Sequence, residues 1–226
     1  MKDKIIVAFD VNQQEDFLKL ALELKGTASF IKIGMECFYS LGPDSVRMAK
    51  DHGFKVFLDL KLHDIPNTVE KSCRAISKLG VDLINVHALG GLEMMKAARN
   101  GCDTKLIAVT HLTSLDQNSL GHELGIKKSI IDSTKNLAAL AKEAGLDGVV
   151  SSAKEVKEIK KLCGNDFLSV TPGIRLNTDE IHDQKRVMTP SQAFKEGSDF
   201  LVIGRSITGS TSPVGTFNKI LESIHD

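Results

Sequence analysis

The sequence lacks an excess of charge of either sign, since 29 lysines and arginines balance 29 aspartates and glutamates among 226 residues. Such a chain has no overall field that draws it to nucleic acid or to an anionic membrane, so we expect neither partner. No apolar run approaches the ~20 residues of a membrane span. The apolar stretch near Met1 is too short for a signal peptide and ends in a charge, which favours a cytoplasmic protein.

The sequence also contains few cysteines, and their spacing does not indicate disulfide bonds or a metal site. The four cysteines, Cys37, Cys73, Cys102 and Cys163, lie far apart and none belongs to a C-x-x-C motif. Buried reduced thiols are therefore favoured over disulfides or a zinc site. The seven histidines do not show the spacing of metal ligands either, so we expect no bound metal.

Eight short apolar runs recur along the chain, and the segments between them carry apolar residues at helical spacing. The runs are 5–10, 30–34, 55–60, 83–88, 106–111, 148–152, 168–173 and 200–206. Several of the helical segments end just before a glycine, as is typical of helix C-termini: Gly53, Gly80, Gly145 and Gly197. Strict alternation of strand and helix predicts a parallel sheet covered by helices.

Eight such units are the number found in a closed (β/α)₈ or TIM barrel, so we predict an α/β protein with a single barrel domain over residues 1–226. An open, doubly wound sheet is the competing fold, but no G-x-G-x-x-G follows the first run. Two connections are long, roughly 113–126 and 174–189. Long connections in a compact barrel are usually functional or mobile.

Charged residues occupy positions that are expected to point into this barrel. Side chains alternate across a strand, and the outward positions in the third run are apolar, which leaves Asp59 and Lys61 facing inward. The same parity places Lys32 and Asp10 inside. Because buried charge is costly unless it is paired, we expect these four side chains to form one alternating network at the C-terminal end of the strands.

Two interpretations of this network are open. It could be a structural ion-pair cluster that closes the barrel, but charge networks at a barrel mouth usually mark chemistry, and we favour an active site. Parity also turns Asn85 and His87 inward. His87, like His63 and His111, fits a hydrogen-bonded core histidine at least as well as a catalytic one.

The run 59–68, D-L-K-L-H-D-I-P-N-T, resembles the D-x-K-x-x-D-I-P-N-T signature of orotidine 5′-monophosphate decarboxylases. The resemblance covers the whole chain. It includes F-D at Asp10, I-K-I-G at Lys32, H-L-T-S at Thr113, T-P-G-I-R through Arg175, D-Q-K-R at Gln184 and V-I-G-R-S-I-T at Gly204 and Arg205.

This resemblance implies a cofactor-free enzyme that converts orotidine 5′-monophosphate to uridine 5′-monophosphate, the last step of de novo UMP synthesis. It implies catalytic roles for Lys61, Asp59, Asp64 and Lys32. It also implies a homodimer in which Asp64, Ile65 and Thr68 reach into the other subunit's site. The implied substrate-binding residues are Asp10, Lys32, Asp59, Lys61, Asp64, Ile65, Thr68, Thr113, Ser114, Pro172, Arg175, Gln184, Gly204 and Arg205.

Within that set, the resemblance implies that Asp10 and Lys32 bind the ribose and that Thr113 and Ser114 contact the pyrimidine. Arg175, Gln184, Gly204 and Arg205 would surround the 5′-phosphate, with 174–189 closing as a lid. The position of Gly204 and Arg205 after the last strand also favours a phosphate site, since phosphates commonly bind at the loops after strands seven and eight of a barrel. A surface arginine capping a helix is the alternative for Arg205.

The expected mechanism makes Lys61 a proton donor. Asp59 lies two residues before it and Asp64 three after, and flanking carboxylates favour the charged form of a lysine. A Schiff-base lysine needs the opposite environment. The nearest rivals are a Mg²⁺-dependent barrel of the 3-keto-gulonate-phosphate decarboxylase or hexulose-phosphate synthase type and a non-catalytic phosphate-binding barrel. The I-P-N-T and D-Q-K-R segments favour the nucleotide enzyme.

Overall fold

The computed structural model describes residues 1–175 and 188–224, and its strands form a closed parallel barrel in the order β1 to β8. The predicted barrel is therefore confirmed, with every strand inside the run that predicted it or one or two residues beyond. The strands are β1 (Ile5–Phe9), β2 (Phe30–Gly34), β3 (Lys55–Leu62), β4 (Leu83–His87), β5 (Lys105–Val109), β6 (Gly148–Val150), β7 (Leu168–Thr171) and β8 (Phe200–Ile203).

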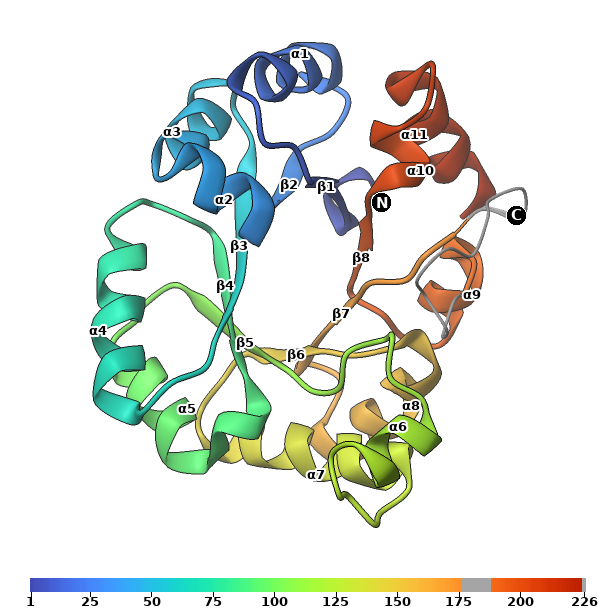
Figure 1. The fold of residues 1–226 in the computed structure, drawn as a ribbon. Coiled ribbons are helices and arrows are strands. Elements are labelled where there is room, and N and C mark those ends of the chain that lie inside the picture. Colours follow the sequence, from blue (N-terminus) through green and yellow to red (C-terminus); the bar gives the residue numbers. More distant parts are fainter. Residues whose placement is uncertain (176–187, 225–226) are drawn as a thin grey trace.

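Helices surround the barrel on the outside (Figure 1). They are α1 (Gln14–Leu24), α2 (Met35–Leu41), α3 (Asp44–Asp51), α4 (Pro66–Ser77), α5 (Gly91–Asn100), α6 (Gln117–His122), α7 (Ile130–Glu143), α8 (Ala153–Cys163), α9 (Pro190–Lys195), α10 (Arg205–Thr208) and α11 (Pro213–Ser223), with 3₁₀ turns η1 (Lys2–Lys4) and η2 (Ala88–Gly90). The predicted glycine stops are confirmed, because Gly53, Gly80, Gly145 and Gly197 all have positive φ.

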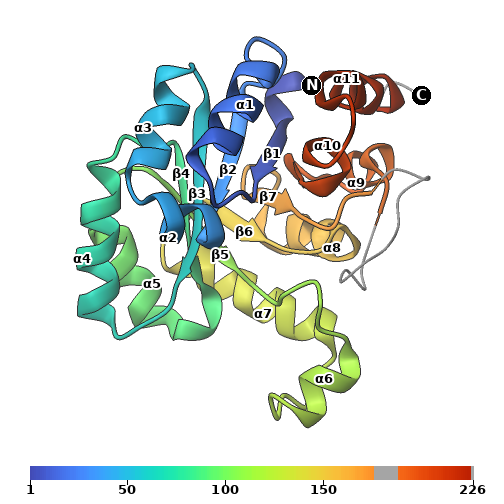
Figure 2. The same ribbon diagram turned by 45° about the horizontal axis from the view of Figure 1, so that its top comes forward.

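The long connection after β5 contains a helix, α6, that periodicity did not indicate. Asp116 begins it by accepting a hydrogen bond from the N–H of Ser119 at 2.9 Å. In Figure 2 this helix stands away from the body of the barrel. Most of the second long connection lies outside the described residues.

Two apolar layers hold the barrel together, and they follow the parity predicted from the sequence. The outward residues of β3, Val56, Leu58 and Leu60, pack into the large cluster between strands and helices. The inward residues form a smaller cluster inside the barrel: Ile6, Ala8, Phe30, Phe57, Leu83, Ile107, Val170 and Val202. The charged side chains of the barrel therefore lie at its two ends, above and below the inner apolar cluster.

A repeated ion pair fastens the N-terminal end of the barrel. Asp82, just before β4, accepts hydrogen bonds from the amine of Lys50 at 2.5 Å and from the N–H of Val56 at 2.7 Å. The same arrangement recurs before two other even-numbered strands: Asp147 with Arg99 and the N–H of Leu106, and Asp199 with Lys160 and the N–H of Ser169. Each aspartate thus joins a helix to the start of the preceding strand.

All four cysteines are free and buried, as predicted. Burial raises the pKa of both Cys37 and Cys73 to about 12, with nearby charged groups contributing less, so these thiols stay protonated at neutral pH. Within residues 1–175 and 188–224, no helix is both long enough and apolar enough to cross a membrane.

Candidate active site

The four predicted charges form one network at the C-terminal end of the barrel. The amine of Lys32 lies 2.9 Å from Asp10 Oδ1 and 3.5 Å from Asp59 Oδ2. The amine of Lys61 lies 2.8 Å from Asp59 Oδ1. Signs therefore alternate along Asp10, Lys32, Asp59 and Lys61, which confirms the predicted network.

The two central members of the network are buried and remain charged. Burial alone raises the pKa of Asp59, but the charges of Lys32 and Lys61 outweigh it and hold that pKa below its ordinary value. Burial alone lowers the pKa of Lys32, and the charges of Asp59 and Asp10 outweigh it and hold that pKa above its ordinary value. A buried carboxylate and a buried ammonium therefore coexist at neutral pH.

The backbone at Lys61 has an unusual conformation. Lys61 has a φ of 52° and is the one non-glycine residue with positive φ in the described part of the chain. The register between β3 and β4 shifts at this point, between Leu58 and Leu62. Irregular strand geometry of this kind commonly re-aims a side chain beside an active site. Here it accompanies the approach of the lysine amine to Asp59.

Asn85 holds this irregular segment in place, a role that the sequence did not reveal. It is 1% exposed, and its amide donates to Asp59 Oδ1 at 2.7 Å. Its carbonyl oxygen accepts the backbone N–H of Lys61 at 2.8 Å. One side chain thus fixes both the carboxylate and the backbone of its lysine partner.

Replacing Asn85 with leucine, which has a similar shape, is expected to lower kcat about 10- to 100-fold with KM changed far less. The leucine cannot orient Asp59 or satisfy the N–H of Lys61, so the reacting groups lose their alignment. Steady-state kinetics on Asn85→Leu measure this, with Asn100→Leu on the exposed end of α5 as the control. An unchanged kcat in a correctly folded Asn85→Leu protein would show that Asn85 does not position the lysine.

Gly34 is a second residue whose role was missed. A Cβ atom at this position would lie 2.6 Å from the amine of Lys32 and 3.0 Å from Asp10 Oδ1. The absence of a side chain at the end of β2 therefore leaves the space in which this ion pair forms. Its backbone is extended rather than left-handed, so it carries no glycine signal other than its position next to the lysine.

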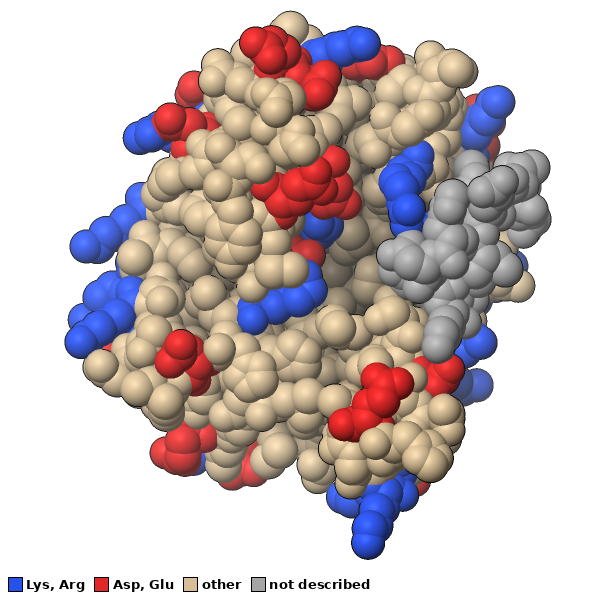
Figure 3. All heavy atoms as spheres, in the orientation of Figure 1, with Lys and Arg blue, Asp and Glu red and all other residues tan. Residues whose placement is uncertain are grey.

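A cavity of about 240 Å³ opens above the inner apolar cluster, and the network forms part of its wall. Figure 3 shows the corresponding hollow, with lysine or arginine and aspartate or glutamate atoms side by side at its edge. Thr113, Ser114 and Pro172 line it, as expected for substrate-binding positions. His111 also lines the cavity. The remaining lining residues are apolar: Phe57, Val109, Leu112, Val150 and Val202. The cavity thus offers a flat group apolar contacts on one side and charges on the other.

Of the expected phosphate residues, the three that the structure describes, Arg175, Gly204 and Arg205, are not part of the cavity lining. Gly204 and Arg205 follow β8 directly, and Arg205 is exposed at the start of α10. Arg175 donates to the carbonyl of Ile174 at 2.9 Å. Gln184, and with it most of the proposed 174–189 lid, lies outside the described residues.

Asp64, Ile65 and Thr68 do not contribute to this chain's own cavity. All three are exposed, and Ile65 is 67% exposed despite its apolar side chain. The carboxylate of Asp64 accepts the N–H of Ile65 at 2.6 Å and makes no ion pair with Lys61 among the described residues. We expected two flanking carboxylates beside Lys61. Within this chain, only Asp59 of those two pairs with the lysine.

Of the three candidate histidines, His111 lines the cavity and His63 and His87 do not, and all three contact other protein groups. The rings of His63 and His87 stack with centroids 5.3 Å apart, and His87 Nδ1 accepts the N–H of Leu89. His111 Nε2 lies 2.8 Å from Ser133 Oγ. Burial, with smaller contributions from the charges of neighbouring groups, lowers the pKa of His87 to about 4. The core-histidine interpretation suits this residue.

The lowered pKa of His87 predicts acid sensitivity of the fold. The unfolded chain takes up a proton on this imidazole near pH 6.5, whereas the folded chain does so only near pH 4, so stability falls as pH drops through that window. We expect His87→Asn to flatten the dependence of the melting temperature on pH between about 6.5 and 4. His122→Asn, on exposed α6, is the control. Equal slopes for wild type and His87→Asn would contradict this assignment.

No group of three or more histidine, cysteine, aspartate or glutamate side chains suited to a metal ion occurs in the part of the chain that the structure describes. What does occur is a closed (β/α)₈ barrel with paired lysines and aspartates at its C-terminal mouth. That combination is typical of the class of (β/α)₈-barrel enzymes, whose active sites lie at the C-terminal ends of the strands.

Comparison with known proteins identifies the family. Residues 3–220 match the Orotidine 5′-phosphate decarboxylase / HUMPS family, and the chain belongs to it. It is 50% identical over 230 residues to orotidine 5′-phosphate decarboxylase of Legionella pneumophila strain Lens, covering 99% of this chain and 100% of that protein. The enzyme of that name from Geobacillus kaustophilus is 46% identical, covering 97% and 94%. The crystal structure of orotidine 5′-phosphate decarboxylase from Lactobacillus acidophilus superposes with a TM-score of 0.87 at 37% identity, covering 99% and 100%.

Proposed function

We propose that this protein decarboxylates orotidine 5′-monophosphate to uridine 5′-monophosphate without a cofactor. The observation that carries the proposal is the amine of Lys61, 2.8 Å from the buried carboxylate of Asp59 in the wall of the cavity. The names of the full-length relatives support the same reaction. Purified protein is expected to lower the long-wavelength ultraviolet absorbance that distinguishes orotidine 5′-monophosphate from uridine 5′-monophosphate, and the absence of any change would overturn the proposal.

The proposed chemistry requires a single acid. The bond between C6 of the pyrimidine and its carboxylate carbon breaks, CO₂ leaves, and the electron pair stays on C6. The ammonium of Lys61 then transfers a proton to C6 and is reprotonated from solvent. Before the transfer, its positive charge stabilises the developing carbanion in a cavity partly shielded from water.

Asp59 has two tasks in this scheme. It orients the Lys61 ammonium through the 2.8 Å contact, and it is itself oriented by Asn85 and Lys32. Its carboxylate also lies where the substrate carboxylate would approach. Repulsion between two carboxylates raises the energy of bound substrate and is relieved when CO₂ departs. Lys32 reduces that repulsion, because its positive charge lies close to Asp59 and partly compensates the negative charge of the carboxylate.

The remaining contacts are proposed to bind and orient the nucleotide. Asp10 and Lys32 suit the ribose hydroxyls, since they lie 2.9 Å apart beside the strand ends and offer an acceptor and a donor. Thr113, Ser114 and Pro172 line the cavity and suit the flat pyrimidine. The phosphate would lie toward Arg175, Gln184, Gly204 and Arg205. Binding energy from the phosphate then helps to assemble the site around the distant reacting carbon.

We also propose that the working enzyme is a homodimer with shared active sites. The segment from His63 to Thr68 is exposed at every position, and it includes the apolar side chain of Ile65. An exposed aspartate next to an exposed isoleucine is suited to entering a neighbouring subunit's cavity. Asp64 would then supply the second carboxylate near Lys61.

We propose a cytoplasmic location for the protein, which its free, buried cysteines support.

Removal of divalent metal ions is expected to leave turnover unchanged. The proposed chemistry uses only the lysine ammonium and carboxylates, so dialysis against a chelator removes nothing that takes part. The decarboxylation rate is measured before dialysis, after it, and after addition of Mg²⁺. A loss of rate that Mg²⁺ restores would instead favour the Mg²⁺-dependent members of this barrel group.

A further inference from the structure

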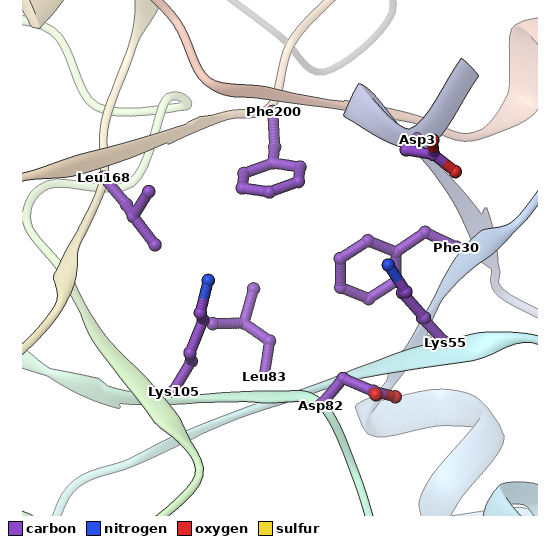
Figure 4. A pocket seen from close by; sticks show the side chains of 8 residues that line it. All are labelled: Asp3, Phe30, Lys55, Asp82, Leu83, Lys105, Leu168 and Phe200. Carbon is purple, nitrogen blue, oxygen red and sulfur yellow. The ribbon is translucent and has the colours of Figure 1, made fainter. Parts of the chain in front are cut away.

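A second cavity of about 240 Å³ lies at the N-terminal end of the barrel, opposite the proposed active site. Six of its eight lining residues are the first residues of their strands: Phe30, Lys55, Leu83, Lys105, Leu168 and Phe200 (Figure 4). Asp3 and Asp82 complete the rim. This end of a barrel normally serves stability rather than binding, so a cavity here needs an explanation.

The floor of this cavity is apolar and partly aromatic. Phe30 and Leu83 are buried members of the cluster inside the barrel. The rings of Phe30 and Phe200 meet edge to face with centroids 5.9 Å apart. Phe30, Leu83 and Phe200 therefore give the cavity an apolar surface against which a flat group can lie.

The rim of the cavity carries two lysines, Lys55 and Lys105, that make no direct ion pair in the described part of the chain. Neither Lys55 nor Lys105 has a carboxylate within salt-bridge distance in the described part of the chain, and in Figure 4 both side chains extend toward the cavity. The two rim aspartates have other direct partners, and Asp3 also interacts electrostatically with Lys55 from beyond salt-bridge distance. Asp82 is held by Lys50 at 2.5 Å, and Asp3 accepts the hydroxyl of Ser29 at 2.7 Å.

We propose that this cavity is a second ligand site, one that binds a small aromatic carboxylate. The ring would lie against Phe30 and Phe200, where aromatic contacts are favourable. The carboxylate would lie between the amines of Lys55 and Lys105, both of which are free to turn toward it. The volume is below that of a drug-sized pocket, which limits the ligand to about one ring.

Benzoate is the probe, and leucine methyl groups are the reporters. Leu83 and Leu168 line the lower cavity, whereas Val109, Val150 and Val202 line the upper one, so ¹³C-methyl spectra distinguish the two sites. Titration is carried out with saturating uridine 5′-monophosphate present. We expect benzoate to shift the lower reporters with a Kd on the order of 1 mM, while benzyl alcohol and benzylamine bind at least about fivefold more weakly.

The variant Lys55→Gln/Lys105→Gln is expected to weaken benzoate binding at least about fivefold and to leave decarboxylation unchanged. Lys71→Gln/Lys154→Gln, which alters two exposed lysines elsewhere, is the matched control and should bind like wild type. Unmoved signals from Leu83 and Leu168, or equal binding of benzoate and benzyl alcohol, would overturn the proposal. Failure of the nucleotide to shift the upper reporters would count against the proposed function instead, and the lower reporters would still test this site.

Discussion

Replacing Lys61 with alanine is expected to reduce decarboxylation by at least about 10⁴-fold while the barrel stays folded. The change removes both the proton donor and the positive charge next to the developing carbanion. The fold should survive because Asp59 keeps its contacts with Lys32 and Asn85. Steady-state turnover and the melting temperature of Lys61→Ala measure the two effects separately.

Lys71→Ala, on the exposed surface of α4, is a suitable control for Lys61→Ala because it removes an amine that touches no part of the cavity. It should match wild type in both measurements. A Lys61→Ala protein that melts normally and still turns over within a few-fold of wild type would show that the lysine is not the acid.

Mixing inactive Lys61→Ala and inactive Asp64→Ala chains is expected to restore activity. If Asp64 enters the partner's site, a hybrid dimer has one site with both changes and one site with neither. Random assortment makes half of the dimers hybrids, so about a quarter of wild-type activity should return. The measurement is turnover of the mixture after the subunits have been allowed to exchange.

Asp59 provides the matched control for this mixing experiment. Asp59 and Lys61 touch within one chain, so they belong to the same site. A hybrid of Lys61→Ala with Asp59→Ala therefore has one damaged residue in each site and should remain inactive. Recovery in the control, or none with Asp64→Ala despite confirmed hybrid dimers, would contradict a shared active site.

The barrel could be predicted because its strands are short and separated by strongly periodic helices. Parity alone then placed Asp59 and Lys61 inside, and the cost of isolated buried charge indicated that they pair. These arguments need only the order of residues along single strands. They located the network before any distance was known.

Contacts between strands could not be predicted in the same way. The positive φ of Lys61 depends on a register shift against β4, and lysine has no intrinsic preference for that conformation. Asn85 was predicted to face inward, yet its hydrogen bond with the backbone N–H of Lys61 follows only from that shifted register. Gly34 matters for a close approach that appears only once Lys32 and Asp10 are positioned.

The segment from Asp64 to Thr68 shows a different limit. Its spacing from Lys61 suggested a carboxylate on each side of the amine, but the chain turns outward after β3 and leaves Asp64 exposed. Distance along a chain does not determine distance in space once a strand ends. Family resemblance, rather than spacing, is what suggests that this aspartate serves the other subunit.

Hydrogen exchange at C6 of the product tests the central claim most directly. The acid that protonates the carbanion is, in the reverse direction, the base that removes the C6 proton of uridine 5′-monophosphate. In D₂O, wild-type protein should therefore introduce deuterium at C6, as followed by proton NMR, and Lys61→Ala should not, although it still binds the nucleotide. Exchange at the wild-type rate in Lys61→Ala would contradict the account.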